Sequence, residues 1–277
     1  MEETAYTAVD IPNPFSDAPV YHAERTGSTM VDAEQLIGGR GLPGLLPPGP
    51  LQSGTVVWAD FQFAGTGRLP GRTWEADSGE SCLFTLILHE DMLRFSPGLF
   101  PLLAGYALLR LLADEYFVDT ALKWPNDLLA DCGGRQKKIS GTLCRKRGRW
   151  FLLGMGVNCN QPAFRGELRN TAVSIRMFSR KKIDIAAFLS SLLAACKEVF
   201  TGAAADGKDG PVQPALLEKC TSHLLFLHRE VIIRKGRPPA ETVFSATLEG
   251  LRPDGGLLYR RPGGGTETLY SGEISLE

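Results

Sequence analysis

The chain has 277 residues, 43% of them hydrophobic, and its 30 basic and 31 acidic side chains leave a net charge of −1. This balance argues against a positive electrostatic potential over the whole protein of the kind that binds nucleic acid. The length suits one large domain and one small one. The apolar runs fall short of the roughly 20 residues that a membrane helix needs, and the acidic N-terminus lacks the pattern of a signal peptide.

Cysteine and histidine spacing gives no sign of a metal centre. The six cysteines are scattered without a C-x-x-C pair, and the four histidines lack H-E-x-x-H spacing. A zinc site is therefore not expected. Scattered cysteines in a chain of this length fit reduced core thiols, so we expect a cytoplasmic protein.

The N-terminal part of the chain predicts a short arm, then strands and a helix. Residues 1–19 are rich in Pro, Asp and Ser and are predicted to be a loose arm. A helix is predicted after Ser28 or Thr29, because both residue types favour the N-cap. A helix start offers free N–H groups to a ligand, although an ordinary cap explains these residues equally well. Short apolar runs predict strands at 20–24, 55–60 and 82–88.

A glycine-rich loop follows the predicted strand at 55–60. It runs from Gln62 to Trp74 and contains three glycines together with Arg68 and Arg72. This composition indicates backbone that wraps a phosphate while guanidinium groups close over it. The G-x-G-x-x-x-G spacing matches neither standard nucleotide fingerprint.

The segment Lys123-Trp124-Pro125-Asn126-Asp127 concentrates a cation, an aromatic ring, a proline, an amide and a carboxylate. Pro125 fixes its own φ and disfavours the helical region for Trp124. Asn126 and Asp127 suit a turn in which their side chains bond nearby backbone. We expect a rigid, partly buried turn that directs polar groups toward a ligand. A purely structural turn remains the alternative.

The rest of the chain predicts helices, a hairpin and a small barrel. Helices are predicted at 99–116, 185–200 and 214–223, and hairpin strands at 139–144 and 150–153. Gly141 and Gly154 interrupt the hairpin strands, which often marks close approach of a ligand. From residue 229 onward, short strands alternate with glycine turns, as in a small SH3-like barrel.

Five collinear motifs resemble the signatures of biotin protein ligases. They are K-W-P-N-D at 123–127, the G-R-G-R-x-G-R-x-W-like loop at 65–74, K-[LI]-[AS]-G at 138–141, G-x-G-[IV]-N at 154–158 and G-E-[IV]-S at 272–275. The resemblance implies an α+β fold. It implies an N-terminal arm at 1–19, a mixed-sheet catalytic domain of the biotin/lipoate ligase type at 20–225, and an SH3-like β-barrel at 226–277.

The resemblance implies ligation in two steps. Biotin would attack the α-phosphate of ATP to give biotinyl-5′-AMP, and a lysine of the biotin carboxyl carrier protein of acetyl-CoA carboxylase would then take the biotin. Because two anions must meet, cations have to neutralise them. The implied catalytic residues are Lys138, Arg68 and Arg72. Mg²⁺ would be held mainly by the phosphates, with Asp127 as the candidate protein ligand.

The matched positions also imply two groups of binding residues. The biotin group is Ser28, Thr29, Met30, Gln62, Thr66, Gly67, Arg68, Lys138, Gly141 and Gly154. The nucleotide group is Arg68, Arg72, Trp74, Lys123, Asn126, Asp127, Lys138 and Asn158.

The chain departs from the family pattern at four positions. Thr66 replaces the first arginine of the loop, Leu69 stands where a basic residue is common, Pro70 is inserted, and Met30 replaces the usual asparagine. We predict a loop that closes less tightly over the intermediate. If biotinyl-AMP leaves this protein and a Thr66→Arg variant at the same rate, that idea is wrong.

Two other functions compete with biotin ligation. A lipoate–protein ligase shares the fold, but K-W-P-N-D and the barrel argue against it. A non-catalytic biotin-binding sensor is disfavoured by the intact Arg68, Arg72 and Lys138. About twenty residues precede the catalytic region, so we expect a short form without a DNA-binding domain and with no membrane partner. A monomer and a homodimer both remain open.

Overall fold

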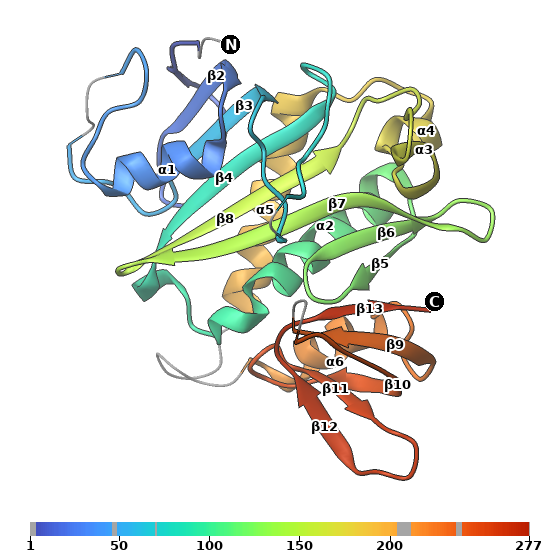
Figure 1. The fold of residues 1–277 in the computed structure, drawn as a ribbon. Coiled ribbons are helices and arrows are strands. Elements are labelled where there is room, and N and C mark those ends of the chain that lie inside the picture. The colour runs from blue at the N-terminus through green and yellow to red at the C-terminus, as the bar shows by residue number, and fades with distance from the viewer. Residues whose placement is uncertain (1–3, 46–48, 70, 204–211, 237–239, 277) are drawn as a thin grey trace.

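The computed structural model describes residues 4–45, 49–69, 71–203, 212–236 and 240–276. Its main element is an eight-stranded sheet in the order β1-β2-β3-β4-β8-β7-β6-β5 (Figure 1). Because β2 and β3 are parallel while the other neighbours are antiparallel, the sheet is mixed. The strands are β1 (Thr7–Val9), β2 (Val20–Thr26), β3 (Val56–Gln62), β4 (Ser81–His89), β5 (Thr120–Lys123), β6 (Asp127–Asp131), β7 (Gln136–Arg147) and β8 (Trp150–Asn158).

Helices cover both faces of this sheet. The short helix α1 (Thr29–Ile37) packs on one face through a cluster that includes Ala33, Leu36 and Leu152. The longer helices α2 (Phe100–Tyr116) and α5 (Ile185–Gly202) cover the opposite face. Side chains of β8 alternate between the two clusters, as the period of a strand requires.

Helix α5 begins where the sequence predicts. The Asp184 carboxylate accepts hydrogen bonds from the backbone N–H groups of Ala186 and Ala187. By length and composition this helix could cross a membrane. Its Phe188 and Leu192 are fully buried in the core with α2, which is the packing of a core helix in a globular domain.

A second, five-stranded antiparallel sheet follows α6 (Pro214–Ser222), in the order β12-β11-β10-β9-β13. This sheet agrees with the expected C-terminal barrel. The chain turns between the last two strands of this sheet at Gly272, which has φ +153°. The strands are β9 (Glu230–Lys235), β10 (Thr242–Leu251), β11 (Leu257–Arg260), β12 (Thr266–Leu269) and β13 (Glu273–Ser275). The short helices are η1 (Glu90–Met92), η2 (Pro97–Leu99), α3 (Leu168–Thr171) and α4 (Ile175–Ser179).

The prediction of a loose N-terminal arm is wrong for residues 4–19. Strand β1 pairs with β2 and extends the sheet by one strand. Tyr6 and Phe15 are buried, and the side-chain amide of Asn13 donates to the carbonyls of Ala18 and Gly54. The prolines and aspartates of this segment favour a loop, but its apolar side chains are enough to fix it to the core.

Candidate active site

The segment 123–127 is the turn between β5 and β6, with Lys123 and Asp127 as register partners. Trp124 is 3% exposed and precedes a cis peptide bond to Pro125. Asn126 ties the turn to β7, since its side-chain amide donates to the Thr142 carbonyl and its own carbonyl accepts from the Thr142 N–H. The prediction of a partly buried turn is confirmed.

The Trp124 ring also contacts the turn at Gly255, between the strands of the five-stranded sheet. Its Nε1 donates to the Gly255 carbonyl of the barrel at 3.0 Å. Close packing continues beside this bond, because a Cβ at Gly98 would lie 2.2 Å from the Asp254 carbonyl oxygen. The turn is therefore fixed between β7 on one side and the barrel on the other.

A cavity of about 510 Å³ opens between the start of α1, the glycine-rich loop and the β7–β8 hairpin. All ten positions predicted to bind biotin line it, from Ser28 to Gly154. Segments far apart in sequence thus meet around one space. Pro70, the inserted loop residue, lies outside the described residues.

One end of this cavity is a fixed polar network. The backbone N–H and the hydroxyl of Thr29 both donate to Gln62 Oε1, at 2.7 and 3.0 Å. Thr29 Oγ1 also meets Thr85 Oγ1 at 3.0 Å. Ser28 occupies the N-cap position, but its side chain makes no capping hydrogen bond, so the ordinary-cap explanation is wrong for Ser28. Sequence reasoning missed Thr85, whose signal is that it alone is polar in the apolar run 82–88.

The opposite wall of the cavity is formed by the backbone of β7 and β8, on which the side chains of Trp74 and Met30 pack closely. Gly141 and Gly156 are register partners on β7 and β8, and a Cβ at Gly156 would lie 2.7 Å from the Trp74 ring. A Cβ at Gly154 would lie 2.6 Å from Met30 Cε. The glycines therefore let the indole and the thioether lie directly on the strands.

Three predicted cations meet beside this wall. Lys138 Nζ lies 2.7 Å from Asp127 Oδ1, as an ion pair without hydrogen-bond geometry, and 5.7 Å from the centre of a Trp74 ring. Arg68 donates to the Gly272 carbonyl at 2.9 Å, and Arg72 lies 3.1 Å from the Glu273 carboxylate. Two carboxylates of the protein, Asp127 and Glu273, thus pair with the cations that an anionic ligand would contact.

A second cavity of about 610 Å³ adjoins the first at Arg68 and Lys138. It is lined by seven of the eight predicted nucleotide-binding residues, and by Glu273 from the barrel. Asn158 is the exception, and its nucleotide-binding role stays a prediction. It is 4% exposed and its amide donates to the carbonyls of Val173 and Lys138, so it supports the strand that carries Lys138.

A third cavity, of about 1130 Å³, lies beside the first and shares Gln62 and Trp74 with it. Aromatic rings, including Phe164, line it. Gln161 is 5% exposed; its Nε2 donates to Ser81, while its Oε1 has no partner among the described residues. Sequence reasoning missed this cavity, because residues 159–168 carry no periodic pattern.

These features agree with comparisons to known proteins. A sequence model described as the biotin/lipoate A/B protein ligase family matches residues 44–161. The chain is 36% identical over 148 residues to the bifunctional ligase/repressor BirA of Bacillus spizizenii, an alignment that covers 50% of this chain and 44% of the relative. It is 29% identical over 251 residues to the biotin–[acetyl-CoA-carboxylase] ligase of Paracoccus denitrificans, covering 87% of this chain and 93% of that one.

A solved structure extends the similarity to the whole fold. The biotin protein ligase from Aquifex aeolicus in complex with biotin and ATP aligns with a TM-score of 0.73 and 24% identity, over 93% of this chain and 98% of the other. The fold that the resemblance implies is thus confirmed. The alignment spans less than half the length of the Bacillus relative.

Proposed function

We propose that the chain is a biotin protein ligase. The observation that carries the proposal is the junction of the first two cavities at Arg68 and Lys138. A ligand with a polar ring and a carboxylate tail fits the first cavity, and a polyphosphate fits the second. The two reacting groups would therefore meet where cations already lie.

In the first cavity, the Thr29–Gln62–Thr85 network would bind the ureido ring. Fixed donors and acceptors on rigid elements select a ligand whose own polar atoms match them. The carboxylate tail would then extend toward Lys138 and Arg68. These cations would stabilise the negative charge that develops as the carboxylate attacks the α-phosphate, and pyrophosphate would leave.

The nucleotide would occupy the other two cavities. Phosphates would lie near Arg72 and Lys123, where they would replace Glu273 as the partner of the loop. The base would enter the aromatic cavity, where Phe164 offers stacking and the unpaired Gln161 Oε1 suits an amino group.

Mg²⁺ would be bound mainly by these phosphates. The described residues contain no group of three metal-binding side chains, which fits a metal that keeps its waters and takes one or two protein carboxylates. Asp127 is the carboxylate in place to orient it. Bound Mg²⁺ would neutralise phosphate charge beside Lys138.

The acceptor in the second step would be a lysine of a biotin carboxyl carrier protein. Its amine would attack the carbonyl of biotinyl-AMP, an amide would form, a proton would be lost and AMP would leave. The names of the Paracoccus relative and of the Aquifex structure support this substrate class. All six cysteines are free thiols, which fits the cytoplasmic location that is part of the proposal.

The test is biotin-dependent exchange of pyrophosphate into ATP, followed by transfer of biotin to a purified carrier domain. Exchange that requires lipoate in place of biotin would favour the related lipoate chemistry. Binding of biotin without exchange or transfer would leave a sensor as the function.

A further inference from the structure

Helix α1 carries one wall of the first cavity and, one turn further on, an anchored carboxylate. Ser28, Thr29 and Met30 line the cavity. Met30 and Glu34 are four residues apart and so lie on the same face of the helix. Met30 Cε rests against Gly154, while Glu34 reaches the tip of the β7–β8 hairpin.

Two arginines of β7 hold this carboxylate. Arg145 Nη1 lies 3.2 Å from Glu34 Oε1, and Arg147 Nη2 lies 3.0 Å from Oε2. The Glu34 side chain is 22% exposed, so solvent screens these pairs only in part. Residues 141, 143, 145 and 147 alternate onto the same face of β7, which places the arginines on the strand face that carries Gly141 and Leu143 of the cavity wall.

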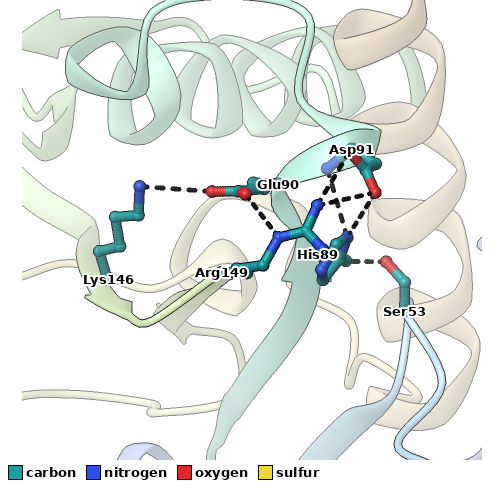
Figure 2. Close-up of polar contacts among 6 residues, drawn as sticks. All are labelled: Ser53, His89, Glu90, Asp91, Lys146 and Arg149. Carbon is teal, nitrogen blue, oxygen red and sulfur yellow. Dashed lines mark hydrogen bonds and ion pairs between the residues drawn. The ribbon is translucent and has the colours of Figure 1, made fainter.

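The opposite face of the same hairpin has a matching arrangement (Figure 2). Lys146 and Arg149 lie 3.4 and 2.7 Å from the carboxylate oxygens of Glu90, in the short helix η1. Arg149 also contacts Asp91, which pairs with His89 at 3.0 Å. Glu90 lines none of the three cavities described above. Of these two sets of ion pairs, the Glu34 set reaches the helix that lines the first cavity, and the Glu90 set lines a separate pocket with Phe95 and Phe151.

We propose that Glu34 is a positioning residue that fixes the spacing between α1 and the β7–β8 wall, and thereby the width of the biotin cavity. This inference rests on the proposed function. Helix α1 has a second anchor, because the buried Asp32 accepts hydrogen bonds from Tyr6 and Thr26 at 2.6 and 2.5 Å. Loss of the Glu34 pairs should therefore shift the helix without unfolding it.

The test is calorimetric titration of biotin into the full chain and its Glu34→Gln variant, with Glu90→Gln as the matched control. Both changes remove one carboxylate charge that faces two cations of the same hairpin. We expect the biotin Kd to rise about 3- to 10-fold in Glu34→Gln, as two partly screened pairs allow. It should change less than about 2-fold in Glu90→Gln, and the ATP Kd should not move in either variant.

A second variant identifies the cause. If the arginines act through Glu34, the Arg145→Gln/Arg147→Gln double variant should weaken biotin binding by the same factor. Adding Glu34→Gln to it should then weaken binding no further. If Glu34→Gln does not fold, this double variant carries the test against Glu90→Gln.

Equal biotin affinity in Glu34→Gln and the unchanged protein would overturn the inference, and so would equal losses in Glu34→Gln and Glu90→Gln. Absence of biotin binding in the unchanged protein would instead refute the proposed function.

Discussion

The contact between Gly156 and the Trp74 indole makes a quantitative prediction. A Cβ at Gly156 would lie 2.7, 2.8 and 2.9 Å from three indole atoms, well inside carbon–carbon contact distance. Overpacking of this kind costs about 1–3 kcal/mol, while Gly→Ala gains about 0.4–1 kcal/mol from the unfolded chain. Gly156→Ala should therefore lower the free energy of unfolding by about 1–2 kcal/mol, which lowers Tm by roughly 2–8 °C for a chain of this size.

The neighbouring Gly154 supplies the control. Its Cβ would meet Met30 Cε at 2.6 Å, but that atom ends a flexible side chain that can move aside. Gly154→Ala should stay within about 1 kcal/mol of the unchanged protein. Thermal unfolding without ligand measures both. In a Trp74→Ala background Gly156→Ala should no longer destabilise; an undiminished loss there would show that the indole is not the cause.

Three further outcomes follow from the site and its supports. Lys138→Met should slow biotin-dependent pyrophosphate exchange by about 100-fold or more, and a loss below about tenfold would remove Lys138 from the reacting centre. Trp124→Phe should lower the free energy of unfolding by about 1–3 kcal/mol, because it leaves the buried Gly255 carbonyl unpaired. Amide hydrogen exchange should become faster where the barrel meets the turn. Unchanged exchange there would show that Trp124 does not hold the two together. Burial raises the pKa of Glu34, but the hydrogen bonds of Arg147 and Arg145 outweigh it and hold the pKa below its usual range. Their stabilisation is complete above about pH 4.3 and is lost as pH falls through the lowered pKa, so the urea stability gap between the protein and Glu34→Gln should narrow from pH 7 to pH 3.

Local sequence patterns predicted most of the helices and strands. Each of these elements has its own apolar periodicity or cap, and tertiary packing leaves that conformation unchanged. The apolar run 82–88 is a central strand, and the Asp184 cap begins α5 where expected. The ten positions predicted to bind biotin also line one cavity, as positions proposed for a single ligand should. Strand β1 was not predicted, because a strand of three residues is too short to show an alternating pattern.

Other features depend on contacts that no local pattern encodes. Asn158 belongs to a motif, yet its amide is used by the backbone of its own domain. Gln161 and Phe164 line a cavity only because the chain after β8 folds back beside Trp74. Glu273 stands in a motif, but its role as the partner of Arg72 requires the barrel to lie against the loop, which the sequence does not state.

The position of Glu273 explains how the barrel can order the loop without blocking a ligand. The Arg72 side chain is 63% exposed and that of Glu273 36%, so water and salt screen the pair, which is worth at most about 1 kcal/mol. Arg68, 28% exposed, also donates to the Gly272 carbonyl. A polyphosphate carries more charge than one carboxylate and brings its own metal, so it can displace Glu273 at little cost. The contact with the barrel therefore holds the loop in place, and under the proposed function the loop would lose little further conformational entropy on binding a nucleotide.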